Sequence, residues 1–219
     1  EYNSVEEIDK WLLSKYNRLV KNVNEYMDNY DLTNTVRDIQ YFVSEDLSNW
    51  YIRRNRNRFW SSELDDSKKA VYHTTYSVLE GICRLIAPIV PFVSEEIYTK
   101  LTGCESVHLA DYPECNLEYI NDNIEERMDL VRNLISLGRN IREEVKIKVR
   151  QPISECLIDG KNKELISDLV PLIEEELNVK NVVFAKDLNE YMRIYGNDFE
   201  KSQKEEVLHQ YVSSYMAKR

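Results

Sequence analysis

The stretch "DLTNTVRDIQYFVSEDLSNWYIRRNRNRFW", Asp31 to Trp60, decides the fold class. Its apolar residues recur every three or four positions, which is the period of one helix face. This stripe consists of Leu32, Val36, Ile39, Val43, Leu47 and Trp50. Asp31 stands where a side chain can cap the start of the helix. The sequence therefore predicts one long helix that ends near Trp60.

The same helical period recurs on both sides of this stretch. Proline cannot donate the helical hydrogen bond, so Pro88 should stop one of these helices, and Gly103 should end another. The sequence predicts further helices at Val5 to about Asn29, about Asp65 to Pro88, Phe92 to Leu101, and Asn121 or Asp122 to about Lys146.

The pattern changes after Lys146. "KIKVRQPISECLIDG" is rich in β-branched residues, "VKNVVFA" reads as a second strand, and Leu165, Leu169 and Ile173 suggest a helix between them. The expected fold is mainly α, a bundle of about five helices followed by a small α/β appendage. We expect the bundle over 1–122, continuing through the helix at 123–146, a small α/β subdomain over 147–186, and a helical tail over 187–219.

Composition narrows the function classes. The chain has 219 residues, 42% of them hydrophobic, and a formal net charge of -10. Its four cysteines show no C-x-x-C spacing, its three histidines have no metal-ligand spacing, and its five glycines form no phosphate-binding loop. No apolar run approaches the ~20 residues of a membrane span. We expect a cytoplasmic protein with no catalytic residue, no metal, no membrane segment and no DNA partner.

The end of the long helix carries four arginines among large aromatic residues. On a wheel of 100° per residue, the core stripe through Trp50 continues to Arg54 and Asn57, which are polar. Guanidinium groups fit phosphates, and aromatic rings are platforms for unstacked bases, so this end suits an RNA loop. The alternative is that the arginines pair with the chain's own 39 acids and the aromatics are core. Composition alone slightly favours this alternative.

A second basic element follows in "LGRNIREEVKIKVRQP". On a helix, Arg139, Arg142 and Lys146 fall on one side, and Lys148 and Arg150 continue beyond it. These cations also meet the negative end of the helix dipole, so RNA binding and a structural role stay equally open. The two basic elements could share one concave surface if their helices are neighbours.

Four segments in this order resemble the anticodon-binding region of the class I aminoacyl-tRNA synthetases. They are Tyr30 to Trp60, "IAPIVPFVSEEIYTKL", "ESVHLADYP" and "GRNIREEVKIKVRQP". The second and third resemble features shared by the isoleucine, valine and leucine enzymes. "DLSNWYIRRNRNRFW" together with "KVRQP" resembles the isoleucine enzymes, in their archaeal and eukaryotic type, which some bacteria also carry.

The resemblance implies a region that positions isoleucine tRNA for a catalytic domain absent from this chain. It implies ATP and magnesium for the full-length enzyme, none in this chain, and the remainder of the synthetase as a partner. The matching segments place the expected tRNA-binding residues at Asn49, Tyr51, Arg53, Arg54, Arg56, Arg58, Trp60, Arg139, Arg142, Lys146, Lys148 and Arg150.

Two other functions stay open. One is the equivalent domain of a valine or leucine enzyme, and the other is a helical module whose arginine end docks onto an acidic protein. The resemblance breaks after "VVFAKD", which leaves the tail without a counterpart.

Overall fold

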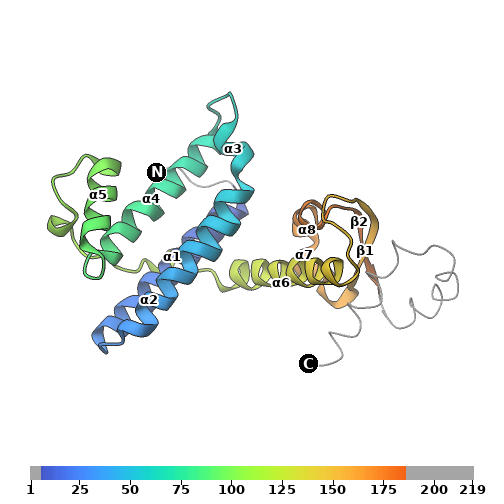
Figure 1. Cartoon of the computed structure of the whole chain (residues 1–219), viewed down its shortest axis with the longest axis horizontal. Coiled ribbons are helices and arrows are strands. Elements are labelled where there is room, and N and C mark those ends of the chain that lie inside the picture. Colours follow the sequence, from blue (N-terminus) through green and yellow to red (C-terminus); the bar gives the residue numbers. More distant parts are fainter. Residues whose placement is uncertain (1–5, 186–219) are drawn as a thin grey trace, which may run out of the picture. The chain divides into compact units, whose positions relative to one another are not determined.

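The computed structural model describes residues 6–185, and they are mainly helical (Figure 1). The chain divides into two compact units, Glu1–Glu125 and Glu126–Arg219, and the boundary falls inside α6 (Asp122–Glu144). Each unit is described by itself. The predicted fold class, a helical bundle with a small α/β appendage, is confirmed. The helical tail predicted over 187–219 lies outside the described residues.

Unit 1 is a helical bundle. In it α1 lies along α2 and η1, α4 packs on α1 and α3, and α5 packs on α4 (Figure 1). Its core includes Trp11, Leu12, Val71 and Leu85, all fully buried. Its elements are α1 (Glu7–Asp28), α2 (Leu32–Tyr41), the π-helix η1 (Phe42–Ile52), α3 (Arg56–Trp60), α4 (Asp66–Ile86), α5 (Pro91–Thr102) and the 3-10 turns η2 (Val107–Leu109) and η3 (Leu117–Tyr119).

Local signals set the ends of these helices as the sequence predicts. The Asp31 carboxylate accepts a hydrogen bond from the Asn34 amide at 3.0 Å, which caps α2. Asp65 does the same for α4 through the Lys68 amide at 2.7 Å. Gly103 ends α5 with φ of 72°, a left-handed conformation that glycine adopts without steric cost.

The prediction of one long α-helix over 31–60 is wrong for its middle part, which is not α-helical. Residues 42–52 form a π-helix with i→i+5 hydrogen bonds, and a turn separates it from α3. Of the predicted stripe, Ile39, Leu47 and Trp50 are buried, whereas Leu32 and Val36 in α2 and Val43 in the π-helix are exposed. Within the π-helix, Phe42 and Tyr51 are buried in addition. Asn55 is 4% exposed, but Arg54 and Asn57 lie outside the core and no residue of α3 is buried, as their polarity predicts.

The helices α1 and α4 approach closely at Gly81. A Cβ atom at this position would lie 1.9 Å from the Tyr16 hydroxyl oxygen, so the absence of a side chain lets the Tyr16 ring lie against α4. Burial of this ring raises the pKa of Tyr16 to about 12. The folded protein therefore holds Tyr16 in its neutral form at a pH where the unfolded chain would ionise it.

This raised pKa predicts an alkaline loss of stability. Tyr16 stabilises the fold fully below the unfolded pKa of about 10, and this contribution is lost as pH rises from about 10 toward about 12. We expect the free energy of unfolding to fall by about 1 kcal/mol per pH unit in that window through Tyr16. Urea unfolding at pH 8 to 11 should show a shallower decline in Tyr16→Phe. Tyr30→Phe, on a ring that is 92% exposed, is the control, and an equal flattening in both variants would contradict the assignment.

Unit 2 is a small α/β unit built around a two-stranded parallel sheet. Strand β1 (Ile153–Asp159) pairs with β2 (Val179–Ala185), and Ile153 lies opposite Val179. Parallel strands need a crossover connection, which here runs through α7 (Lys163–Ile166), a 3-10 turn η5 (Ser167–Leu169) and α8 (Val170–Leu177). Gly138 of α6 admits the Leu177 side chain, because a Cβ atom there would lie 2.6 Å from a Leu177 methyl carbon.

Among the helices of residues 6–185, none is both long enough and apolar enough to cross a membrane.

Candidate nucleic-acid interface

The arginine-rich end of the second helix is divided between side chains that face inward and side chains that face solvent. Asn49 and Tyr51 belong to η1, Arg53 and Arg54 to the helical residues that follow it, and the remaining predicted residues to α3. Solvent reaches Asn49, Arg53, Arg56 and Trp60 freely and Arg54 in part, whereas Tyr51 is fully buried. Tyr51 therefore cannot meet a ligand, while the four freely exposed side chains and Arg54 can.

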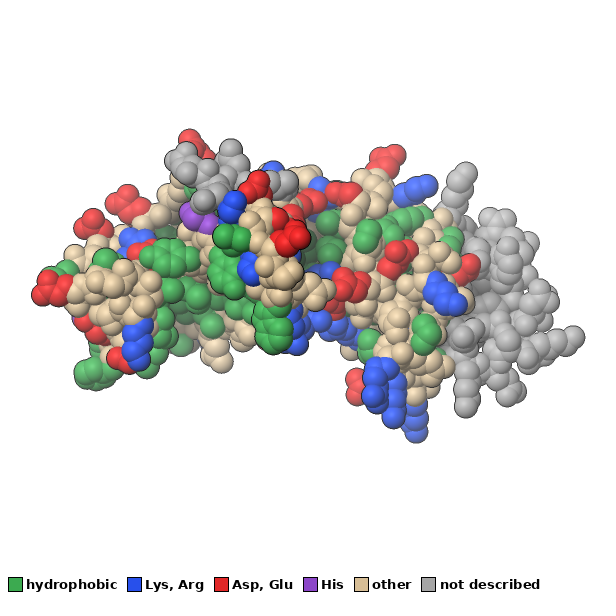
Figure 2. Space-filling model, turned by 90° about the horizontal axis from the view of Figure 1, so that it is seen from above, with side chains coloured by type: hydrophobic (Ala, Val, Ile, Leu, Met, Phe, Trp, Pro, Cys, Tyr) green, Lys and Arg blue, Asp and Glu red, His purple; other side chains and the backbone are tan. Residues whose placement is uncertain are grey.

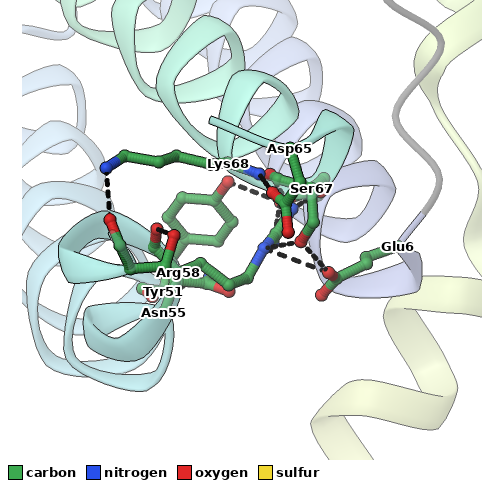
Figure 3. A network of polar contacts seen from close by, with 9 residues as sticks. Glu6, Tyr51, Asn55, Arg58, Asp65, Ser67 and Lys68 are labelled. Carbon is green, nitrogen blue, oxygen red and sulfur yellow. Dashed lines mark hydrogen bonds and ion pairs between the residues drawn. The ribbon is translucent and has the colours of Figure 1, made fainter. Parts of the chain in front are cut away.

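Arg58 faces inward and joins α3 to α1 and α4 (Figure 3). Its two terminal nitrogens donate to the two carboxylate oxygens of Asp9 at 2.9 and 2.8 Å. Its Nε donates to the Ser67 hydroxyl at 2.8 Å, and Glu6 lies 3.0 Å from the same nitrogen. The Arg58 side chain is 13% exposed and Asp9 is 0% exposed, so this is a largely buried ion pair.

Tyr51 completes this buried cluster. Its hydroxyl donates to Asp9 at 2.5 Å, and Asn55 donates to the Tyr51 carbonyl at 2.9 Å. Burial, reinforced by the charge of Asp9, raises the pKa of Tyr51, so its hydroxyl stays protonated and keeps donating. Tyr51 and Arg58 thus take the structural role that the alternative interpretation assigned to the aromatics and arginines. Tyr51 is fully buried and the Arg58 side chain is only 13% exposed, so neither residue is among the RNA contacts proposed below.

The other predicted residues at this end of the helix are exposed fully or in part, and we call them the arginine tip: Asn49, Arg53, Arg54, Arg56 and Trp60. The Arg53 Nε donates to the Asn49 carbonyl at 2.8 Å, and the Arg54 guanidinium carbon lies 5.7 Å from the centre of the Trp50 ring. Trp60 is 82% exposed at the end of α3. Exposed guanidinium groups beside an exposed indole can bind phosphates and stack on a base.

The second predicted basic patch belongs to unit 2 and is also divided. The Arg139 side chain is partly exposed and pairs with Glu176, whereas Arg142 is 1% exposed. Helix α6 ends at Glu144, so the expected helical side of Arg139, Arg142 and Lys146 does not exist as one surface. The exposed members beyond the helix are Lys146, Lys148 and Arg150. The two patches lie on separate units.

On the face shown in Figure 2, basic, acidic and hydrophobic side chains are interspersed, and the basic ones form small separate groups. A net charge of -10 does not attract a polyanion, so RNA binding would depend on such local groups.

Sequence reasoning missed Asp9, Glu6 and Ser67, which hold Arg58. Asp9 carried a signal, because it lies three residues before Leu12 and therefore on the apolar face of α1. A carboxylate on a buried helix face needs a cationic partner. That rule indicates a buried arginine but does not indicate which one.

Within the described part of the chain, no group of three or more His, Cys, Asp or Glu residues could hold a metal ion.

A comparison with known protein families finds a match that covers most of the chain. The family described as "Anticodon-binding domain of tRNA ligase" matches residues 9–157, which include both basic patches.

Individual relatives agree with this match. The chain is 47% identical to an isoleucine-tRNA ligase of Clostridium novyi over 191 residues, 84% of this chain and 18% of the relative. It is 42% identical to isoleucine-tRNA ligases of Chlamydia caviae and Clostridium tetani, covering 85% and 84% of this chain and 18% of each relative. The chain thus spans about a fifth of the length of these relatives. They are bacterial, so they do not support the archaeal and eukaryotic type expected from the sequence.

Proposed function

Because the chain belongs to the anticodon-binding domain family of tRNA ligases, we propose that it binds the anticodon arm of isoleucine tRNA. The observation that carries this proposal is the arginine tip, which lies inside the matched region. The names of the relatives support isoleucine as the amino acid. In this proposal the chain positions the tRNA for a cytoplasmic aminoacylation that uses ATP and magnesium, carried out by the remainder of the synthetase.

The predicted contact residues differ in the exposure of their side chains, which suggests different roles for them. Arg53, Arg54 and Arg56 would bind phosphates and supply most of the affinity, since phosphate contacts position RNA without reading its sequence. Trp60 or Asn49 would approach a base, because stacking and base-edge hydrogen bonds carry the specificity. Tyr51 and Arg58 support the tip from inside. Arg139 is partly exposed and pairs with Glu176, so it would have to exchange this partner to contact RNA.

Binding of the whole 219-residue chain to three RNAs tests this function. They are an isoleucine tRNA transcript, a copy with a substituted anticodon, and a valine tRNA, each titrated across a range of salt. We expect the isoleucine transcript to bind most tightly, and all three affinities to fall steeply as salt rises. Equal affinity for all three would contradict anticodon recognition by this chain.

The same titration separates the two alternatives. A valine enzyme would prefer the valine tRNA, and adding a leucine tRNA extends the comparison to the leucine enzyme. A module that docks an acidic protein would also be sensitive to salt, but it would not respond to a changed anticodon.

A further inference from the structure

The segment from Lys146 to Arg150, which we call the basic loop, presents three cations of unit 2 to solvent. Lys146, Lys148 and Arg150 are exposed, and Val149 between them is 43% exposed. Ile147 points inward and is 8% exposed, so it anchors the loop. Among residues 6–185, no side chain forms an ion pair or hydrogen bond with the side chains of these three cations.

Lys146 holds an unusual position at the end of α6. The Ile147 amide donates to the Arg142 carbonyl at 2.9 Å and the Lys146 amide to the Glu143 carbonyl at 3.1 Å. This pair of bonds is a Schellman motif, which requires a left-handed residue and usually has glycine there. Lys146 adopts φ of 58° instead. A lysine at this position is unfavourable for the backbone, and it adds a charge that glycine would not provide.

Arg142 fixes the backbone of the basic loop from inside. Its guanidinium donates to the carbonyls of Lys148 at 3.1 Å and Gln151 at 3.0 Å, and to those of Leu177 at 2.6 Å and Asn178 at 3.2 Å. Asn178 adds a second restraint, because its side-chain amide donates to the Val149 carbonyl at 2.9 Å. The loop is therefore held in one conformation from two sides.

The charge of Arg142 is not neutralised by an acid. It is 1% exposed, no carboxylate of the described residues pairs with it, and its Nε has no hydrogen-bond partner there. Residues 142–150 carry four cations against Glu143 and Glu144, which are exposed at the end of α6. A buried charge without a counter-ion adds to the positive potential of the surface above it.

We propose that the basic loop is a preorganised binding surface for the phosphates of an RNA backbone, with Arg142 as its positioning residue. The cations lie along an exposed loop, which suits the repeated phosphates of a nucleic acid. The inference rests on the proposed function, and it gives unit 2 an RNA contact of its own. Arg142 acts through the loop backbone and does not touch the RNA.

Lys146→Gly is the sharpest test, because glycine suits the left-handed position and removes only the charge. We expect amide hydrogen exchange in β1 and β2 to be unchanged or slower, while the slope of log affinity against log salt falls by about 0.7 to 0.9. Adding Lys148→Gln and Arg150→Gln should lower the slope by about 2. Between 50 and 200 mM salt, the unmodified chain would then lose on the order of 20-fold more affinity for the tRNA transcript than this triple variant.

The control variant carries Lys161→Gln, Lys163→Gln and Lys180→Gln, which remove three exposed charges elsewhere in unit 2. It should leave the slope nearly unchanged. An equal effect in the control and the basic-loop variant would mean that only total charge matters, and it would overturn the proposal.

A double-mutant cycle between Arg142 and the three cations of the basic loop tests the positioning role of Arg142. Arg142→Met should lower the salt slope about as much as the triple variant, and combining both should add little. If Arg142→Met prevents unit 2 from folding, Asn178→Gly removes the second restraint while suiting its own left-handed backbone, and should lower the slope in the same direction. An unchanged slope in the folded variants would overturn the role.

The outcomes separate this inference from the proposed function. If the unmodified chain binds no tRNA, the proposed function fails, and the inference fails with it. If it binds, and variants at Arg53 and Arg56 weaken binding while the basic-loop variants do not, the basic loop alone is overturned.

Discussion

Replacing Asp9 with alanine should lower the free energy of unfolding of unit 1 by about 3 kcal/mol, because it removes the buried partner of Arg58 and leaves the more exposed Glu6 as its remaining counter-ion. Asp9 accepts both terminal nitrogens of Arg58 and the hydroxyl of Tyr51, and it is 0% exposed. Its loss would remove the acceptor of the Tyr51 hydroxyl and two of the hydrogen bonds of Arg58 inside the bundle. The link between α1 and the end of α3 would be lost with it.

Tryptophan fluorescence during urea unfolding would measure this loss. All three tryptophans, Trp11, Trp50 and Trp60, lie in unit 1, so their signal reports on that unit alone. Asp66→Ala is the control, since Asp66 pairs with Lys69 at an exposed surface and should change the free energy by less than about 1 kcal/mol. A loss below about 1 kcal/mol for Asp9→Ala would show that the Arg58 cluster does not hold the bundle together.

The double variant Arg53→Gln with Arg56→Gln should lower the affinity for the isoleucine tRNA transcript by about 100-fold at low salt. Hydrogen bonds from a charged donor contribute about 1.5 kcal/mol or more each, and two such contacts would be lost. The salt slope should also fall by about 1.5 to 2. Both side chains are exposed, so the fold of unit 1 should be unaffected.

A control variant that loses the same number of positive charges elsewhere in unit 1 shows how much of the loss in affinity is due to net charge alone. Lys21→Gln with Lys100→Gln removes the same charge from exposed positions on α1 and α5, and should reduce affinity by about threefold or less. Because phosphate contacts carry no sequence information, the loss at the arginine tip should be similar for the isoleucine, anticodon-substituted and valine RNAs. A loss confined to the isoleucine tRNA would mean that Arg53 or Arg56 reads a base.

The features predicted correctly from the sequence depend on near neighbours in the chain. Asp31 caps α2 through an amide three residues away, and Gly103 ends α5 by its own backbone preference. The π-helix has no such signal, because an i→i+5 ladder is retained only where packing of residues such as Phe42 and Tyr51 against α1 outweighs the poorer backbone geometry.

The sequence indicated which regions of the chain are basic, but it did not indicate which of their arginines are exposed and which are buried. Arg58 and Arg142 look like their exposed neighbours in the sequence, but each is bound by groups far along the chain. Arg58 meets Asp9, 49 residues earlier, and Arg142 meets the Leu177 carbonyl, 35 residues later. Helix periodicity places side chains around an axis, and it does not identify which distant acid or carbonyl lies opposite.

Because η1 is a π-helix, the direction of the helix beyond it depends more on the number of residues in η1 than on their identity. Each of its hydrogen bonds spans one residue more than in an α-helix, so the direction in which the tip emerges depends on how many residues η1 contains. Deleting one residue there could be absorbed by reverting to α-helix, but everything beyond it would swing by roughly a quarter of a revolution. Arg56 and Trp60 would then no longer point outward, and Arg58 would leave Asp9. In this stretch, we expect the fold to tolerate substitutions at exposed positions better than the loss or gain of a residue.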